Sequence, residues 1–281
     1  MSWGAKEQLA GALGPEVATR QRAAVDRMNS TARNQTGSAP SIFAIALATF
    51  TGNVLAALAT VFFSLATIAV AWIPPRGHWS NRVFRGWART ILFLSGVRVE
   101  VERAGELPPD EHFIFMANHL SGFDIPALLV TLPGDVRFLA KKSLFKVPLA
   151  GWALAADGAI AVDRRDRSRA VETFKAAVAR LREGASVVIF AEETRSLDGK
   201  VAEFRSGGVL LALRSGLSVV PVGIEGTLEV RRKGSLLVRP GRVVVRYGEP
   251  VPMAEYSIRD KRTLAADLRR RVAELANAEL A

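Results

Sequence analysis

The sequence predicts an α/β fold, a mostly parallel sheet flanked by helices, preceded by an N-terminal membrane-inserting helical segment. Two observations lead to this fold class. No charged residue occurs between Arg33 and Arg76. From Val97 onward, short β-branched runs alternate with segments of helical periodicity, which is the pattern of βαβ units. The chain therefore divides into a polar segment (1–40), a membrane segment (41–75), an amphipathic interfacial helix (76–96) and an α/β domain (97–281).

The composition limits the function classes. The chain of 281 residues has 38 Lys and Arg against 27 Asp and Glu, a formal net charge of +11. This excess predicts an anionic partner, either nucleic acid, a membrane surface or a phosphorylated substrate. The absence of cysteine excludes disulfide scaffolds, thiolate nucleophiles and cysteine metal sites. Any catalytic imidazole must come from His78, His112 or His119.

The membrane segment is almost continuously apolar from Ile42 to Ile73. It exceeds the roughly 20 residues that cross the hydrocarbon, and it begins too far along the chain for a secretory signal peptide. A straight helix of this length, about 48 Å, is too long for an upright span. We favour a re-entrant hairpin broken at Gly52-Asn53. A single tilted span and a buried core helix are the alternatives.

The next segment predicts an amphipathic helix from Trp79 to Leu94. Its tryptophans, Trp79 and Trp87, lie at helical spacing with Ile91, and arginines occupy other positions around the axis. This pattern is typical of a helix at the membrane interface. A helix that faces the core of the domain is the alternative.

The sequence of the domain that follows predicts eight strands and two long helices. The strands are expected at Val97–Val101, Phe113–Ala117, Val136–Ala140, Ala159–Val162, Val187–Ala191, Val219–Gly223, Leu236–Arg239 and Val243–Tyr247. Several are continuous apolar runs, as expected for strands buried on both faces of a parallel sheet. The helices are expected at Ala170–Glu183 and Arg262–Leu280, from their apolar periodicity.

One His and one Asp carry the strongest chemical signal. The sequence contains no nucleophile elbow, P-loop, dinucleotide fingerprint or His-Glu-x-x-His motif. Instead, His119 follows a predicted strand, and Asp124 lies five residues further on. A tight turn through Ser121-Gly122 brings the carboxylate back to the imidazole, as a general base requires. A lone His near a helix start is otherwise more often a packed or capping residue.

Further motifs follow this pair in order. They are Asn118-His119 to Pro126, Gly158 to Arg164, Phe190 to Ser196, and Val220-Pro221-Val222. Together they resemble the four ordered blocks of the glycerolipid acyltransferase family, and within it the lysophosphatidate (1-acyl-sn-glycerol-3-phosphate) acyltransferases. The resemblance covers about Trp87 to Pro252 and includes a Lys-rich stretch from Lys141 to Lys146.

The resemblance implies the roles of particular residues. His119 and Asp124 would be the catalytic pair, which makes 97–281 the acyltransferase catalytic domain. The residues implied to bind the acceptor, by its phosphate or its polar head, are Arg164, Glu192, Thr194, Arg195 and Lys142. A guanidinium suits a phosphate better than an ammonium does.

The implied reaction transfers an acyl group from a thioester, acyl-CoA or acyl-carrier protein, to the free sn-2 hydroxyl of lysophosphatidate, giving phosphatidate in phospholipid biosynthesis. We expect no metal and no bound cofactor, because a thioester is already activated. The expected partners are the lipid bilayer, a lyso-phospholipid and the acyl donor, not nucleic acid. We expect the catalytic domain at the cytoplasmic face of the inner membrane.

The third block departs from the family pattern at one position. Glu193 stands where the family has Gly. The change matters if the backbone there needs a positive φ, and it places a carboxylate near Arg195. A lyso-lipid with another headgroup, such as lyso-ornithine lipid, is therefore an alternative acceptor. Two rival function classes remain open, a non-enzymatic binder of anionic lipid or nucleic acid and a hydrolase that uses His119 to activate water.

Overall fold

The structure is a computed structural model that describes residues 42–74, 77–108, 110–163, 170–182 and 184–281. The chain divides into two compact units, Met1–Ala48 and Thr49–Ala281. Of the first unit only residues 42–48, the start of one helix, are described. The sheet and the helices that surround it belong to the second unit.

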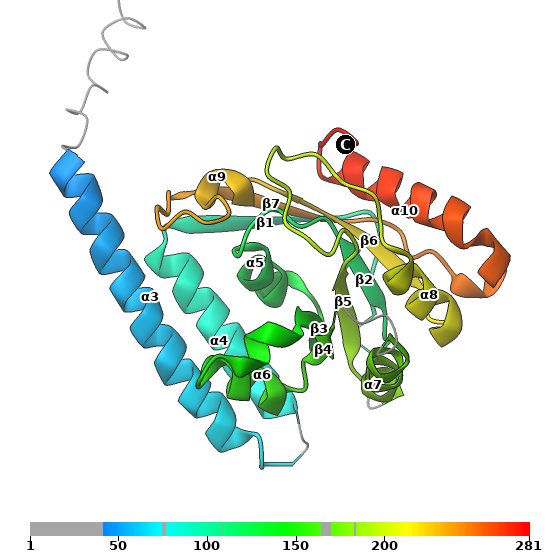
Figure 1. The fold of residues 1–281 in the computed structure, drawn as a ribbon, viewed down its shortest axis with the longest axis horizontal. Helices are drawn as coiled ribbons and strands as arrows, with labels where there is room; N and C mark the ends of the chain where they lie inside the picture. Colours follow the sequence, from blue (N-terminus) through cyan, green and yellow to red (C-terminus); the bar gives the residue numbers. More distant parts are fainter. Residues whose placement is uncertain (1–41, 75–76, 109, 164–169, 183) are drawn as a thin grey trace, which may run out of the picture. The chain divides into compact units, whose positions relative to one another are not determined.

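The second unit consists of helices around one sheet, and it includes the first described helix, α3, from Thr49 onward (Figure 1). The helices are α3 (Ile42–Val70), α4 (His78–Leu94), α5 (Asp124–Thr131), α6 (Ala150–Asp157), α7 (Ala170–Arg182), α8 (Ser206–Ser215), α9 (Thr227–Val230) and α10 (Lys261–Leu275). The strands are β1 (Val97–Arg103), β2 (Ile114–Ala117), β3 (Val136–Lys141), β4 (Ile160–Val162), β5 (Ser186–Phe190), β6 (Val219–Glu225) and β7 (Gly241–Tyr247). Short 3₁₀ turns are η1 (Lys142–Lys146), η3 (Met253–Glu255) and η4 (Ile258–Asp260).

The sheet has seven strands in the order β1-β7-β6-β2-β5-β3-β4. All neighbours are parallel except β6 and β7, which run antiparallel. The central strands β2 and β5 are buried along their whole length, and each face of the sheet is covered by its own hydrophobic cluster. The loops after β2 and β5 leave the same edge of the sheet, where ligand sites of open α/β sheets form.

The predicted α/β class is confirmed, with two corrections within the domain. Seven of the eight predicted strands form, but Leu236–Arg239 lies in a loop, because its backbone bonds to other groups. The N–H of Leu237 donates to Ser235 Oγ, and that of Arg239 donates to the carbonyl of Val230. The last helix ends at Leu275 rather than Leu280, and Asn277 then takes a φ of 49°.

α3 is one continuous helix, so the hairpin break expected at Gly52-Asn53 is wrong. α3 packs against α4 through a close approach at Gly86, where an added Cβ would stand 3.0 Å from the ring of Phe63. Trp87 Nε1 donates to Thr60 Oγ1 over 3.1 Å. Trp87 therefore packs inside the domain, as the core-facing alternative for its helix predicts.

Within the described residues, Thr49–Val70 of α3 is the one stretch long and apolar enough to cross a membrane. Only 11% of its most apolar window is buried in the protein. The exposed fractions of Leu58, Phe62 and Leu65 are 61%, 64% and 52%. α3 thus offers one face to the domain and leaves a second, apolar face uncovered.

Candidate active site

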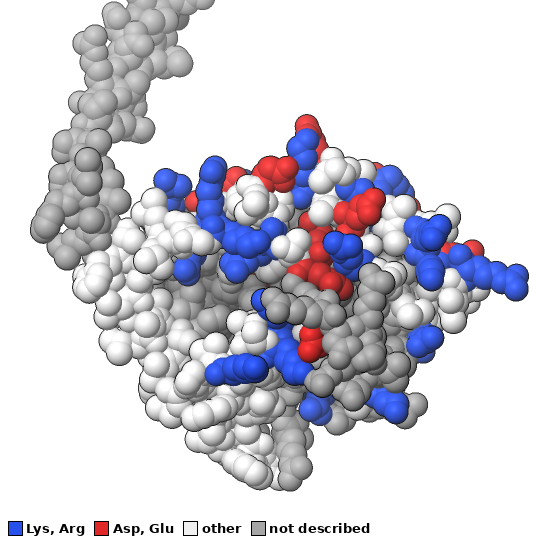
Figure 2. Space-filling view, in the orientation of Figure 1, with Lys and Arg blue, Asp and Glu red and all other residues white. Residues whose placement is uncertain are grey.

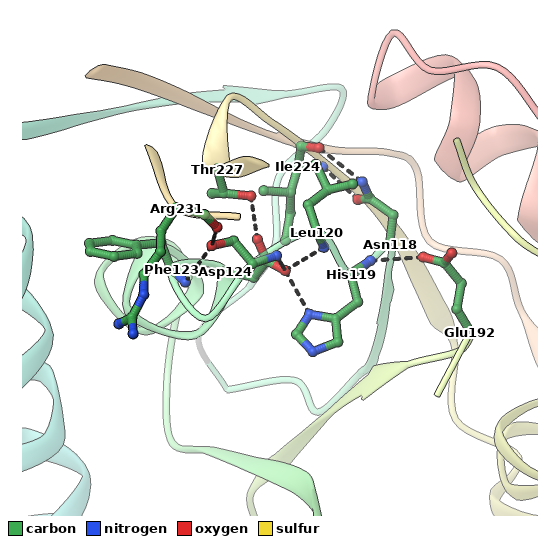
Figure 3. A network of polar contacts seen from close by, with 10 residues as sticks. Asn118, His119, Leu120, Phe123, Asp124, Glu192, Ile224, Thr227 and Arg231 are labelled. Atoms are coloured by element: carbon green, nitrogen blue, oxygen red, sulfur yellow. Dashed lines mark hydrogen bonds and ion pairs between the residues drawn. The ribbon is translucent and has the colours of Figure 1, made fainter. Parts of the chain in front are cut away.

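His119 and Asp124 form a hydrogen-bonded pair at the carboxyl end of β2 (Figure 3). His119 Nδ1 lies 2.6 Å from Asp124 Oδ2. The imidazole stacks on the ring of Phe190, the last residue of β5, with centroids 4.0 Å apart. The contact to Asp124 fixes the ring orientation and favours the tautomer with its proton on Nδ1, which leaves Nε2 free to accept a proton. The pairing predicted from the spacing is confirmed.

Asp124 is fully buried and held by four donors. Its Oδ2 also accepts hydrogen bonds from the backbone N–H groups of Leu120 and Ser121, at 2.7 and 2.9 Å. Its Oδ1 accepts from the hydroxyl of Thr227, the first residue of α9. A carboxylate with both oxygens held by fixed donors cannot rotate away from the imidazole.

Hydrogen bonds with β6 and with the segment after β5 fix the backbone around His119 from both sides of β2. The Asn118 side chain donates to the carbonyl of Ile224 and accepts from its N–H, at 2.9 and 2.8 Å. The carbonyl of His119 accepts from the N–H of Ser196. These bonds tie the turn after β2 to the segments after β5 and along β6, so that the imidazole has a fixed position.

Glu192 is part of this hydrogen-bond network, which corrects its expected role in holding the acceptor. Its side chain is buried, and its two oxygens accept hydrogen bonds from the backbone N–H groups of His119 and Ala202, both at 2.8 Å. Burial raises the pKa of the Glu192 carboxyl, although those two N–H groups oppose the shift. With both oxygens engaged, Glu192 positions the His119 backbone.

A cavity of about 450 Å³ opens beside His119. Its walls are mostly apolar and come from α3, α4, α5, β3 and α6. The lining side chains of these elements include Phe63, Phe84, Trp87, Ile125, Leu129, Phe138, Leu139 and Leu154. Asp157, the last residue of α6, also lines the cavity. The cavity suits a long apolar chain whose reactive end lies at the imidazole.

Cations and a hydroxyl complete the lining of the cavity. Thr194 and Arg195, two of the residues expected to bind the acceptor, line it from the loop after β5, together with Lys141 and Lys233. Figure 2 shows Lys and Arg side chains gathered around a hollow in this face. Among the described residues, none of these three cations has an acidic partner. Their charge is therefore available to an anionic ligand.

Lys142 and Arg164 are the two other residues expected to contact the phosphate. Lys142 does not line the cavity, and its Nζ lies 3.3 Å from Asp163 Oδ2. The neighbouring Lys141, which the sequence reasoning missed, takes the place in the cavity wall. Lys141 is the last residue of β3 and Lys142 the first of η1, so the two lysines belong to different elements. Arg164 lies outside the described residues.

Glu193 has a φ of 59°, in the left-handed region that favours glycine. The condition under which the loss of Gly matters, a positive φ at this position, is therefore met. Its Oε1 lies 3.9 Å from the place where a Cβ on Gly207 would stand, near the N-terminus of α8. The partial positive charge of a helix N-terminus favours a carboxylate there.

Comparison with known proteins agrees with this site. The Acyltransferase family model matches residues 98–225, which contain both members of the His119–Asp124 pair and the loop after β5. A solved structure, the 1-acyl-sn-glycerophosphate acyltransferase PlsC of Thermotoga maritima, superposes with a TM-score of 0.69 at 27% identity, covering 82% of this chain and 95% of that one. This chain is therefore similar to acyltransferases in its sequence over residues 98–225 and in its fold.

Curated proteins similar to this chain carry related names. A chloroplastic 1-acyl-sn-glycerol-3-phosphate acyltransferase of Arabidopsis thaliana is 31% identical over 63% of this chain and 50% of its own length. The alpha form from Ovis aries is 28% identical over 68% of this chain and 67% of its own. The chain spans about half the length of the first of these relatives and somewhat less of the Chlamydomonas reinhardtii protein, at 44%.

Proposed function

We propose that this chain transfers a fatty acyl group from a thioester to the free sn-2 hydroxyl of lysophosphatidate, giving phosphatidate. The observation that carries the proposal is the place of the His119–Asp124 pair. The imidazole lines a mostly apolar cavity, which is also lined by cations that have no acidic partner among the described residues. An apolar acyl chain and a phosphate are the two parts that such a lining recognises. The names of the relatives support the same substrate pair.

In the proposed reaction His119 Nε2 removes the proton of the acceptor hydroxyl. The hydroxyl oxygen attacks the thioester carbonyl carbon, a new C–O bond forms, and the C–S bond breaks. The proton on Nε2 then passes to the leaving thiolate, so atoms and charge balance. Asp124 accepts the hydrogen bond from Nδ1 and stabilises the imidazolium across the 2.6 Å contact. Because the thioester is already activated, the scheme needs neither a metal nor a resident cofactor.

The remaining lining residues position the substrates. Arg195 and Lys141 bind the acceptor phosphate, and the Thr194 hydroxyl adds a hydrogen bond. The acyl chain lies between α3 and the sheet, where each buried CH₂ contributes about 0.8 kcal/mol. The donor is acyl-CoA or acyl-carrier protein. The apolar face of α3 meets the bilayer, so both lipids reach the site from the membrane. We place the chain at the inner membrane with the domain on its cytoplasmic face.

The test is acyl transfer by full-length protein in neutral detergent, with acyl-CoA and a panel of lyso-lipids. Wild type should consume lysophosphatidate. His119→Ala should lose roughly 10²- to 10⁴-fold in kcat, because it lacks the base. Asp124→Asn should lose less, since the base remains. Unchanged thermal unfolding would show that both variants fold.

Each other result has a definite meaning. Fatty acid released without any acceptor indicates a hydrolase. Preference for a lyso-lipid that lacks a phosphate rejects lysophosphatidate as the acceptor. A fully active His119→Ala variant rejects the mechanism.

A further inference from the structure

A loop between α9 and β7 brings a cation to the cavity from a part of the chain outside the family blocks. It begins Arg231-Arg232-Lys233 and turns at Gly234, which has a φ of 82°. Of these cations, only Lys233 lines the cavity. The loop follows the fourth block and lies beyond the segment matched by the family model.

The loop is held in place by bonds at its base and tip. Arg231 Nε donates to the carbonyl of Ser235 over 2.8 Å, and the N–H of Ser235 donates to the carbonyl of Arg232. The N–H of Arg239 closes the base on the carbonyl of Val230. The loop therefore holds the Lys233 backbone in one place, which reduces the entropy lost when its side chain binds a ligand.

Two longer-range bonds connect the loop to the rest of the site. Ser121 Oγ, in the turn between His119 and Asp124, donates to the carbonyl of Arg231 over 2.6 Å. Asn53 Nδ2 of α3 donates to the carbonyl of Leu236 over 2.8 Å. Lys233 thus stands between the catalytic turn and the helix that forms one cavity wall.

The charge of Lys233 is not used within the described part of the protein. Most Lys and Arg side chains around β7 and α10 have carboxylate partners, such as Arg242 with Glu100 and Arg246 with Glu102 and Glu225. Lys233 has no such partner among the residues described, and it follows two arginines. Consecutive like charges repel one another, and an anion bound between them removes that repulsion.

We propose that Lys233 binds a phosphate group of a substrate at the cavity, as a contact additional to Arg195 and Lys141. This inference rests on the proposed function, which supplies two phosphate-bearing substrates. The phosphate belongs either to the acceptor, lysophosphatidate, or to the CoA part of the donor. The shared chemistry is an oxyanion held by an ammonium group, which forms a strong charge-assisted hydrogen bond.

The test compares Lys233→Ala with Arg232→Ala in the full-length protein. Both remove one positive charge from the same loop, but only Lys233 lines the cavity. Lys233→Ala should raise the KM of one substrate roughly tenfold, with little change in kcat, because the contact forms in both ground and transition states. Lys233→Arg should restore most of the affinity. Arg232→Ala should leave both KM values within about twofold.

The substrate whose KM rises identifies the phosphate. Binding without turnover is measured separately with lysophosphatidate, with CoA, and with monoacylglycerol, which lacks the phosphate. Lys233→Ala should weaken binding of one phosphate ligand and leave that of monoacylglycerol unchanged. If neither phosphate ligand loses affinity, or if Arg232→Ala has the same effect as Lys233→Ala, the proposal is wrong. If Lys233 supports binding but wild type transfers no acyl group, the proposed function fails and the phosphate contact stands.

Discussion

At Glu193 the backbone conformation and the side-chain charge have opposite effects on the stability of the folded protein. A φ of 59° is unfavourable for a side chain with a Cβ, by about 1 to 2 kcal/mol. Its carboxylate near the N-terminus of α8 is favourable by about 0.3 to 1 kcal/mol. Glu193→Gln removes the charge and keeps the backbone cost, whereas Glu193→Gly removes both. We expect the Gly variant to exceed the Gln variant by about 1 kcal/mol in free energy of unfolding. Denaturant unfolding measures this difference, and equal stabilities would contradict it.

The contrast between His119 and Glu192 shows which residue roles could be read from the sequence. The His119–Asp124 contact was predictable because both residues lie on one short turn. For Glu192 it was the family resemblance that implied a ligand contact. Its actual partners include the N–H of His119, 73 positions away, and that pairing depends on how β2 and β5 align. Thr227, which bonds Asp124 from α9, gave no sequence signal for the same reason.

Among the elements, α6 places a buried acidic group in the lining of the cavity. Asp157 ends α6, and its Oδ1 lies 3.9 Å from Arg137 Nη1 of β3. That oxygen has no hydrogen-bond partner among the described residues. Burial raises the pKa of Asp157 to about 7, although Arg137 and Ser80 lower it. The folded protein therefore holds a proton on Asp157 more tightly than the unfolded chain, where the pKa of Asp is about 3.9.

The raised pKa of Asp157 predicts a pH dependence of stability. Below about pH 4 Asp157 is protonated in both the folded and the unfolded state, and its full contribution to the free energy of unfolding is present. This contribution declines as the pH rises and is lost above about pH 7. The loss is on the order of 4 kcal/mol. Asp157→Asn should give a flatter stability profile, with a residual slope from Glu192, whose pKa burial also raises. Urea unfolding in detergent from about pH 5 to about pH 8 tests this, with the exposed Glu255→Gln as control. A wild-type slope retained in Asp157→Asn would contradict it.

The errors in predicting elements also have physical causes. The Leu236–Arg239 run has the composition of a strand, but it bonds to α9 and α3 through single backbone groups rather than along a sheet edge. The Gly52-Asn53 pair is a typical helix breaker in water. In α3 the side chain of Asn53 bonds to the carbonyls of Thr49 and Leu236, which removes its competition with the helix backbone. The contact that joins Asn53 to Leu236 spans 183 positions of the chain, which no local pattern indicates.

In the domain as a whole, α3 combines two roles on different faces. Thr60, Phe63, Ser64 and Thr67 line the cavity, whereas Leu58 and Leu65 are 61% and 52% exposed and lie outside its lining. Removing α3 would therefore open the cavity and remove the apolar face together. Point substitutions on the exposed face separate the roles, because they leave the cavity wall in place.

The membrane role predicts how the protein partitions. Full-length protein should stay with membranes in high salt and leave only with detergent, because burial of an apolar face does not depend on ionic strength. Each Leu buried in lipid contributes about 1.5 to 3 kcal/mol. Replacing both Leu58 and Leu65 by Glu should therefore weaken membrane binding by about 3 to 6 kcal/mol and release the protein into the soluble fraction.

The matched control replaces Ile258 and Leu280, which lie outside α3 and are 54% and 47% exposed, by Glu. It adds the same charge and should leave the protein in the membrane pellet. Equal release of both double variants would show that net charge, rather than the α3 face, holds the protein to the bilayer.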